Sequence, residues 1–263
     1  MAGAVIFEAA DADGVARVTL SNPGKLNAID IAMWQALRTG FEALQALPAA
    51  QAPCVVLLRG ADGHFASGGD IVEFAQFRFD ESGLRHFHED TVAPALQALL
   101  DCDIPLLAQI DGACIGGGLE IAACCDIRIA AASSRFGAPI AKLGFPMAPG
   151  ELQILERVVG APLMRQMLLE ARLFDAAEAL RLGLVHTVCA DADLAGHAAQ
   201  RCRHMAALSP QAARINKRTL RQTAAGGPSA AERQAHFSYA DSPQHREGVS
   251  AFIDKRTPRF ERG

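Results

Sequence analysis

The sequence predicts an α/β protein in which parallel strands alternate with helices. Two apolar runs, at residues 54–58 and 104–110, have the length and composition of strands buried on both faces. Roughly forty residues separate these runs, which is enough for a crossover connection that contains a helix. After residue 150 the apolar spacing is mostly helical. Together these observations indicate strand–helix–strand units followed by a helical region.

The N-terminal part contains a strand, a helix and a second strand. Residues 15–20 alternate weakly and are rich in β-branched side chains, which predicts a strand, and a Ser-Asn-Pro-Gly turn follows at 21–24. Residues 29–47 place apolar side chains at helical spacing, with Asp30 as a suitable N-cap. Prolines at 48 and 53 end this helix, and the buried strand at 54–58 leads into a loop at 59–63.

The middle and C-terminal parts follow the same logic. The crossover before the strand at 104–110 should hold a helix at 82–100, and residues 126–130 are typical of a third strand. Further helices are expected at 151–159, 162–170, 175–182, 194–207 and 210–225, and in a final segment from residue 230.

Composition limits the function classes. The chain has 263 residues, of which 50% are hydrophobic and 21% charged, as in a globular protein. A net charge of −4 gives no general case for binding nucleic acid or an anionic membrane. One predicted helix has a basic face, formed by Arg214, Lys217, Arg218 and Arg221. Contact with an acidic protein or with another subunit explains this face as well as RNA binding does.

The chain is expected to work in the cytoplasm. Its first residues lack the basic and apolar regions of a signal peptide, and no uncharged apolar run is long enough to suggest a spanning helix. The seven cysteines form no CxxC pair, so reduced, buried thiols in a reducing compartment are expected.

The most informative motif is Gly116-Gly117-Gly118-Leu119-Glu120. Glycines at a helix start expose unpaired N–H groups that can hold an oxygen which becomes negative during a reaction. Glu120 stands three residues after Gly117, so its carboxylate should lie over that glycine. This pattern indicates enolate chemistry. The alternative is that Glu120 only complements the helix dipole and that the glycines mark tight packing.

Several motifs, in this order and at this spacing, resemble the crotonase family, also called the enoyl-CoA hydratase/isomerase family. They are the segments 22–28 (NPGKLNA), 64–71 (HFASGGDI), 116–120, 125–130 (CDIRIA), 136–139 (FGAP), 142–144 (KLG) and 247–258 (EGVSAFIDKRTP). The resemblance covers nearly the whole chain. It implies a spiral core of ββα units at 1–200. A C-terminal helical region at 201–263 would form homotrimers, which commonly pair into hexamers, and complete the coenzyme A site.

The resemblance also implies roles for individual residues. Gly69 and Gly117 would form the oxyanion hole for an acyl-CoA thioester, with Glu120 as the acid/base. Coenzyme A would enter as part of the substrate, so no separate cofactor and no metal are expected. The implied substrate-binding positions are Lys25, Ala28, Ala66, Gly68, Asp70, Ile71 and, from this or a neighbouring subunit, Lys255.

The sequence departs from the family at one catalytic position. In the hydratases a second glutamate follows Phe-Gly-x-Pro directly, and here that residue is Ile140. Two carboxylates commonly divide the proton transfers of hydration, so ordinary hydratase activity is in question. A one-carboxylate isomerase, a decarboxylase or a thioester hydrolase is an alternative on the same scaffold, and for a decarboxylase Ile140 would be a substrate-binding residue in an apolar slot. A non-catalytic acyl-CoA-binding protein is another.

Other side chains could replace the missing glutamate. Glu151 follows the family's glycine-rich turn, although a glutamate there is also typical of the start of the next helix. His86, His88, Glu89 and Asp90 lie in the stretch that lines the acyl pocket in relatives, or else form a solvated helix face. His86 and His88 are two residues apart and so do not share a helix face, which argues against a metal site.

Overall fold

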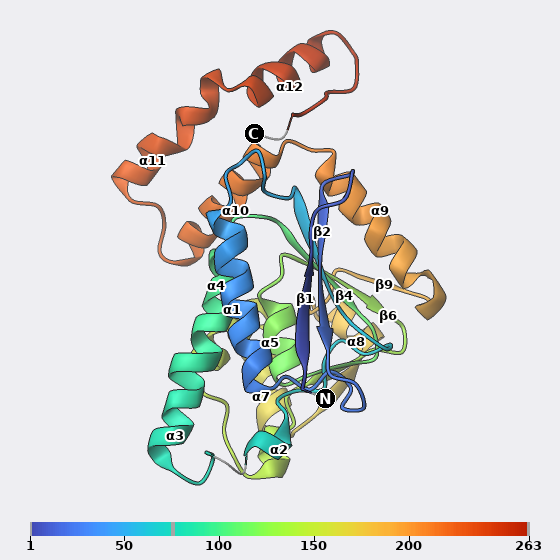
Figure 1. Cartoon of the computed structure of the whole chain (residues 1–263), viewed down its shortest axis with the longest axis vertical. Helices are drawn as coiled ribbons and strands as arrows, with labels where there is room; N and C mark the ends of the chain where they lie inside the picture. Colours follow the sequence, from blue (N-terminus) through green and yellow to red (C-terminus); the bar gives the residue numbers. More distant parts are fainter. Residues whose placement is uncertain (1, 75–76, 262–263) are drawn as a thin grey trace.

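Two β-sheets form the centre of the molecule (Figure 1). The computed structural model describes residues 2–74 and 77–261. The larger sheet has the order β1-β2-β3-β4-β6-β9, with bounds Ala4–Glu8, Val15–Ser21, Val55–Gly60, Leu106–Ile110, Ile127–Ala131 and Thr187–Cys189. The smaller sheet has the order β5-β7-β8, with bounds Ala113–Ile115, Arg135–Gly137 and Leu173–Asp175. The predicted α/β class is confirmed.

The four predicted strands all exist and pair in parallel, β2 with β3, β3 with β4, and β4 with β6. Every residue of β4 is buried, as the continuous apolar run indicated. The strands that the sequence did not predict are β1, which is largely exposed and pairs antiparallel with β2, and four strands of three residues each. Three residues carry too little periodicity to be recognised.

The chain winds as a spiral, and successive turns contribute to both sheets. After β4 it enters the small sheet as β5, and after β6 it enters it again as β7, which pairs in parallel with β5. After β3 a single residue, Ala66, bridges in parallel to Cys114 of β5. The segments that follow β3 and β4 therefore lie in register beside each other, although they are far apart in the sequence.

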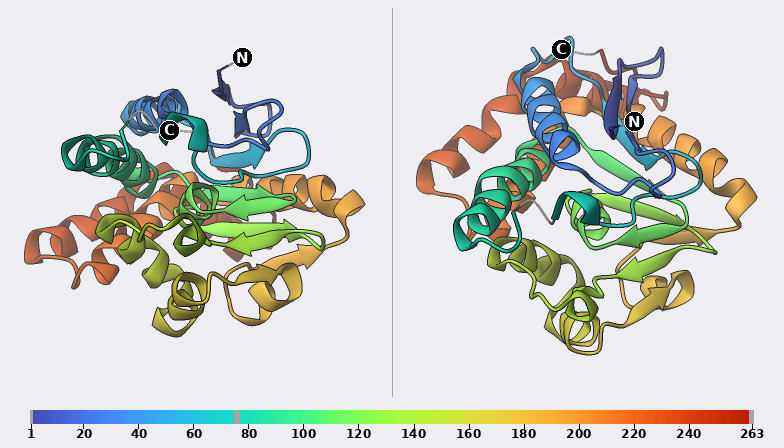
Figure 2. Two further views of the ribbon diagram at one scale, coloured as in Figure 1. Left: turned by 90° about the horizontal axis from the view of Figure 1, so that it is seen from below. Right: turned by 60° about the horizontal axis from the view of Figure 1, so that its bottom comes forward.

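Helices pack around these sheets (Figures 1 and 2). The α-helices are α1 (Ile31–Ala46), α2 (Ile71–Phe74), α3 (Glu81–His86), α4 (Ala93–Asp101), α5 (Gly117–Ala123), α6 (Pro149–Val159), α7 (Ala161–Leu169), α8 (Ala176–Arg181), α9 (Leu194–Ala206), α10 (Pro210–Ala224), α11 (Ala230–His236) and α12 (Pro243–Ile253). Short 3₁₀ turns are η2 (Ile140–Leu143), η3 (Asp191–Asp193) and η4 (Phe237–Asp241).

The structure confirms the predicted N-cap of α1 and divides the helix predicted at 82–100. Asp30 caps α1 as expected, because its carboxylate accepts a hydrogen bond of 2.8 Å from the Met33 N–H. The single helix predicted at 82–100 is instead α3, a π-helical segment η1 (Phe87–Val92) and α4. The π segment changes which side chains point inward, and such segments often occur at functional sites.

The basic face of α10 binds the chain's own core. Arg218 and Arg221 form ion pairs of 2.6 and 2.8 Å with the buried Asp103, and Lys217 pairs with Asp126 at 2.7 Å. Arg214 donates to the Pro53 carbonyl at 3.1 Å. The three external partners considered for this face, an RNA, an acidic protein or a second subunit, are therefore not needed to explain it.

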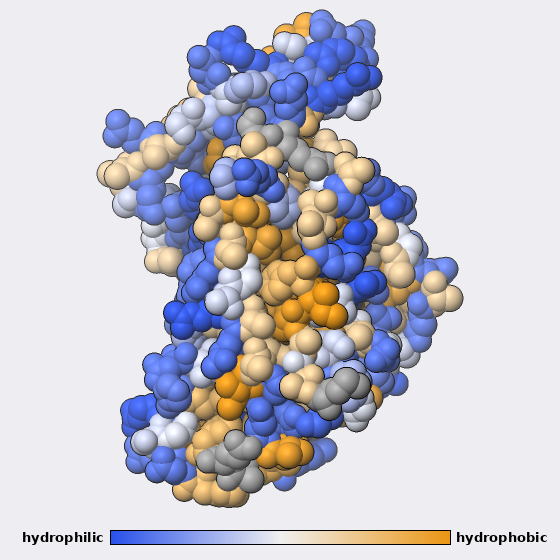
Figure 3. Space-filling model, in the orientation of Figure 1, coloured by the Kyte–Doolittle hydropathy of each residue, from blue (hydrophilic) through white to orange (hydrophobic). Residues whose placement is uncertain are grey.

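Beyond α10 the chain leaves the body of the molecule, and α11 and α12 project from it (Figures 1 and 2). The face of this arm seen in Figure 3 is mainly hydrophilic, whereas apolar side chains gather lower on the body. Phe252 and Ile253 of α12 are nevertheless 86% and 71% exposed. No helix in the described ranges is both long and apolar enough to cross a membrane. None of the seven cysteines, all within the described ranges, forms a disulfide, and six of them are buried, as expected.

Candidate active site

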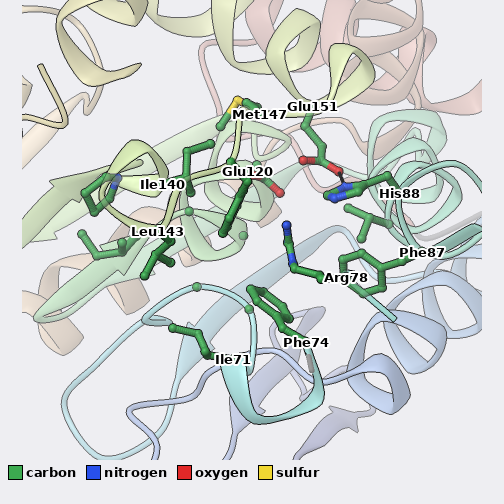
Figure 4. Close-up of a pocket in the computed structure, with 18 of the residues that line it drawn as sticks. Ile71, Phe74, Arg78, Phe87, His88, Glu120, Ile140, Leu143, Met147 and Glu151 are labelled. Carbon is green, nitrogen blue, oxygen red and sulfur yellow. Dashed lines mark hydrogen bonds and ion pairs between the residues drawn. The ribbon is translucent and has the colours of Figure 1, made fainter. Parts of the chain in front are cut away.

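A cavity of about 300 Å³ lies between the two glycine loops and the helices that follow them. Its wall is mostly apolar, with Phe74, Ile140 and Met147 among the lining residues. Five ionisable residues also line it. Lys142 is exposed, and Figure 4 shows the other four turned toward one another: Arg78, His88, Glu120 and Glu151. The combination of an apolar wall and a few convergent polar groups is typical of a small-molecule site.

The register of the small sheet brings Gly69 and Gly117 together. The Ala66 N–H donates to the Ala113 carbonyl at 2.9 Å, and the Ile115 N–H donates to the Ala66 carbonyl at 3.0 Å. Both glycines come three residues after the bridged pair, Ala66 and Cys114. A Cβ built on Gly117 would lie 3.8 Å from the Gly69 nitrogen, so the two loops are in contact.

The N–H groups of these two glycines have no partner within the described part of the chain. Gly69 lies between two residues whose backbone bonds go to Ile29, namely the Gly68 carbonyl and the Asp70 N–H, so its own N–H points away from that contact. Gly117 is the first residue of α5 and has no preceding turn to which it could donate. Both glycines line the cavity.

The neighbouring glycines are required by geometry. Gly116 has φ +49° and ψ −119°, a conformation that L side chains rarely adopt. A Cβ on Gly118 would lie only 2.5 Å from the Ala66 carbonyl oxygen. The glycine run therefore provides the tight packing that the alternative interpretation proposed, and that packing is what places Gly117 beside Gly69.

Glu120 faces the cavity from the first turn of α5 and is 6% exposed. Burial raises the pKa of its carboxyl well above the ordinary value, and the nearby Glu151 raises it further. His88 and Arg78 act in the opposite direction. Glu120 is thus a buried acid whose proton is held more firmly than in water.

Glu151 lies in the first turn of α6, as one interpretation of the sequence held, but its side chain also enters the cavity and the residue is only 5% exposed. Its Oε1 lies 2.5 Å from Nδ1 of His88. Burial raises the pKa of Glu151 to about 8, and Arg78 opposes that rise. Burial and then Arg78 lower the pKa of His88, so its ring is neutral at pH 7.

Of the four residues predicted around His88, only His88 enters the cavity. His86 and Asp90 pair with each other at 2.8 Å on an exposed face, and Glu89 is exposed as well. The solvated-face interpretation therefore holds for these three. In the described residues no group of three or more His, Cys, Asp and Glu side chains is arranged to hold a metal ion.

Arg78 also faces the cavity and was not among the residues predicted from the sequence. Its guanidinium lies over the rings of Phe74 and Phe145, 3.8 and 3.9 Å from their centroids. Its buried Nε has no hydrogen-bond partner among the described residues. A lone arginine within the aromatic-rich segment 74–79 was the signal that could have identified it.

Some of the remaining predicted site residues line the cavity and others lie outside it. Ile140 begins η2 and lines the cavity, as do Gly68 and Ile71. Lys25 pairs with the buried Asp70 at 2.5 Å. Ala28 and Ala66 are buried, and Lys255 follows α12 and is not among the residues that line the cavity. The structure therefore brings Gly68, Gly69, Ile71, Gly117, Glu120 and Ile140 into one site. Substrate contacts by these six residues, and by the other five (Lys25, Ala28, Ala66, Asp70 and Lys255), stay predictions.

Known proteins share both the sequence and this architecture. The profile of the enoyl-CoA hydratase/isomerase family matches residues 10–263. A probable enoyl-CoA hydratase of Mycobacterium leprae is 34% identical over 94% of this chain and 96% of its own length. The 2,3-dehydroadipyl-CoA hydratase of Escherichia coli is 35% identical over 92% and 93%. A crystal structure of an enoyl-CoA hydratase/carnithine racemase from Magnetospirillum magneticum has a TM-score of 0.91 at 36% identity, covering 99% of this chain and 96% of that one. The chain belongs to the enoyl-CoA hydratase/isomerase family.

Proposed function

We propose that this enzyme forms and protonates the enolate of an acyl-CoA thioester. In this proposal the N–H groups of Gly69 and Gly117 hold the thioester oxygen as it gains negative charge. Both groups line the cavity and lack a partner in the described chain, which supports the role. Removing one donor of such a pair typically slows catalysis by about 100-fold or more.

Glu120 then moves the proton at the carbon next to the thioester. The observation that carries the proposal is that its buried carboxyl shares one small cavity with both free N–H groups. Burial raises its pKa, which suits a group that must both hold a proton and release it to carbon. In an enolate formed at this site, the two glycine N–H groups would hold the negatively charged oxygen, and Glu120 would reach the carbon that exchanges its proton.

The substrate contacts outside the cavity are proposed from the family resemblance. Lys25 and Asp70 form an ion pair beside the Gly68-Gly69 loop, where a coenzyme A chain would enter. Lys255 would reach that ligand only from a second chain, consistent with the proposed homotrimer or dimer of trimers. The exposed apolar residues of α12 support self-association through this arm.

Two alternative functions are distinguished from the proposed one by their reactions. A one-carboxylate isomerase would use Glu120 alone, and a non-catalytic protein would bind acyl-CoA without turnover. The test measures hydration of crotonyl-CoA, isomerisation of a 3-enoyl-CoA, loss of CO₂ from malonyl-CoA, thioester hydrolysis, and deuterium uptake at C2 of butyryl-CoA in D₂O. We expect deuterium uptake by the wild type and a loss of at least about 100-fold in Glu120→Gln, with acyl-CoA binding retained. Unchanged uptake in Glu120→Gln, or binding without any reaction in the wild type, contradicts the proposal.

A further inference from the structure

We propose that Glu151, positioned by His88, is the second acid–base residue of this site and activates the water that adds to a 2-enoyl-CoA. The inference rests on the proposed enolate function and extends it to hydration. It assigns to α6 the carboxylate that is absent at Ile140.

Glu151 and Glu120 approach the cavity from different elements. Glu120 comes from α5 and Glu151 from α6, and these two helices pack against each other. Figure 4 shows both carboxylates at the same end of the cavity, beside the His88 ring. Ile140 and Met147 line another part of the wall and leave the polar groups gathered at that end.

His88 fixes the orientation of Glu151. The Nδ1–Oε1 separation of 2.5 Å joins two side chains that are 15% and 6% exposed. A neutral imidazole with its proton on Nδ1 donates to the Glu151 carboxylate and leaves the second carboxylate oxygen free for water. The π-helical segment η1 carries His88 inward, which gives that irregular segment a function.

The charges around the two carboxyls favour a shared proton. Two buried carboxyls facing one cavity cannot both ionise easily, so over a range of pH the pair keeps one proton. The groups facing Glu151 are Glu120 from α5, Arg78 from the segment before α3, and His88 from η1, while the exposed Glu89 of η1 acts on it only through its charge. The Glu151 carboxylate has a hydrogen-bond partner in His88, whereas the Glu120 carboxyl has none in the described part of the chain, so Glu120 keeps the proton while Glu151 ionises first, with Arg78 stabilising the anion.

This state can add water without any further reagent. The Glu151 carboxylate takes a proton from water while the water oxygen bonds to C3 of the enoyl group. The C2–C3 π electrons move into the thioester, whose oxygen is held by the two glycine N–H groups. Glu120 gives its proton to C2, and the charge returns from oxygen as the C2–H bond forms. Glu120 has lost one proton and Glu151 has gained one, so the pair still holds one proton. Transfer of that proton from Glu151 to Glu120 restores the starting state.

The test compares Glu151→Gln with Glu156→Gln, a matched control on the exposed face of the same helix. Two rates are measured for each protein, crotonyl-CoA hydration and deuterium uptake at C2 of butyryl-CoA. We expect Glu151→Gln to lose at least about 100-fold in hydration. Its deuterium uptake should stay within about threefold of the wild type or rise, because a neutral Gln removes the negative charge that keeps Glu120 protonated. Glu156→Gln should change neither rate.

The outcomes separate the two proposals. Hydration by Glu151→Gln within about threefold of the wild type overturns the role of Glu151, and so does a wild type that exchanges but does not hydrate. Equal loss of both rates in Glu151→Gln also overturns it, because the two carboxylates would then not act at different atoms. Unimpaired exchange in Glu120→Gln instead overturns the enolate function itself.

His88 has its own test, which does not depend on the folding of Glu151→Gln. Removing the Nδ1–H donor in His88→Ala should raise the pKa of Glu151, so the rise of hydration rate with pH moves to higher pH. His88→Gln keeps a donor amide and should restore part of the wild-type pH profile. A lower rate with an unchanged profile in His88→Ala contradicts the positioning role, since a purely structural defect would not move the profile.

Discussion

Replacing Gly118 with Ala should disturb the oxyanion loops without touching either proposed donor. The added Cβ would lie 2.5 Å from the Ala66 oxygen, 2.8 Å from its Cβ and 3.1 Å from its carbonyl carbon. Ordinary contact begins at 3.4 Å, so the Ala66 segment must move by about 0.9 Å. The Ala66 carbonyl is also the acceptor for the Ile115 N–H, so this movement strains the link between the two loops.

The magnitudes follow from that displacement. Forcing a methyl group into a packed site costs about 1–3 kcal/mol of unfolding free energy. Gly69 follows Ala66 by three residues, so a shift of nearly 1 Å misplaces its N–H relative to that of Gly117. Misplacement of this size can slow catalysis by about 100-fold. We therefore expect Gly118→Ala to fold, with a lower urea midpoint and a much lower rate of deuterium uptake into butyryl-CoA.

Gly196→Ala is the matched control. Gly196 lies within α9, and a Cβ there would meet nothing within 4 Å. Alanine should raise the unfolding free energy by about 0.5–1 kcal/mol and leave the rate unchanged. If Gly118→Ala unfolds at the wild-type urea concentration and exchanges at the wild-type rate, then contact with Ala66 does not set the position of the oxyanion loops.

The remaining predictions concern charge. Because burial raises the pKa of Glu151, its contribution to the free energy of unfolding is full below about pH 4 and is lost as pH rises through about 8. In urea unfolding, the free energy of unfolding of the wild type should fall over this interval and that of Glu151→Gln should fall less. Parallel curves for the two proteins would contradict this. Arg78→Met should move the rise of hydration rate to higher pH, because Arg78 lowers the pKa of both carboxyls, whereas the exposed Arg85→Met should not; equal profiles for all three proteins would refute the assignment. Asp103→Asn removes the partner of Arg218 and Arg221 and should lower the unfolding free energy by about 1–3 kcal/mol at pH 7. The lowered pKa of Asp103 stabilises the fold above about pH 4 and ceases to do so in acid, so the variant and wild type should converge at low pH, and a constant difference would argue against the ion pairs.

The long helices and strands could be predicted because each contains many apolar residues whose spacing shows which side is buried. The apolar runs of β3 and β4 and the helical spacing of α1 are examples. The small sheet could not be predicted in the same way, since β5 has three residues and Ala66 contributes a single bridge. Yet these short pairings decide which glycines meet.

The site was predictable where one motif supplies its parts. Gly117 and Glu120 are three residues apart on one helix, so their proximity follows from helix geometry. Glu151 could be named as an alternative to Ile140 but not chosen, because its partner His88 lies 63 residues away and turns inward through a π-helical segment that no sequence pattern indicated. Arg78 lies between short helices, where no periodicity fixes the direction of a side chain.

A crystal structure of the enzyme with bound acetoacetyl-CoA would show directly whether the two glycine N–H groups hold the thioester oxygen. We expect this oxygen about 3 Å from both the Gly69 and the Gly117 nitrogen, with Glu120 beside C2 and Glu151 beside C3. A thioester oxygen bound elsewhere, with both N–H groups unoccupied, would contradict the enolate mechanism. A structure that keeps the oxygen in place but turns Glu151 away from C3 would contradict its role in hydration alone.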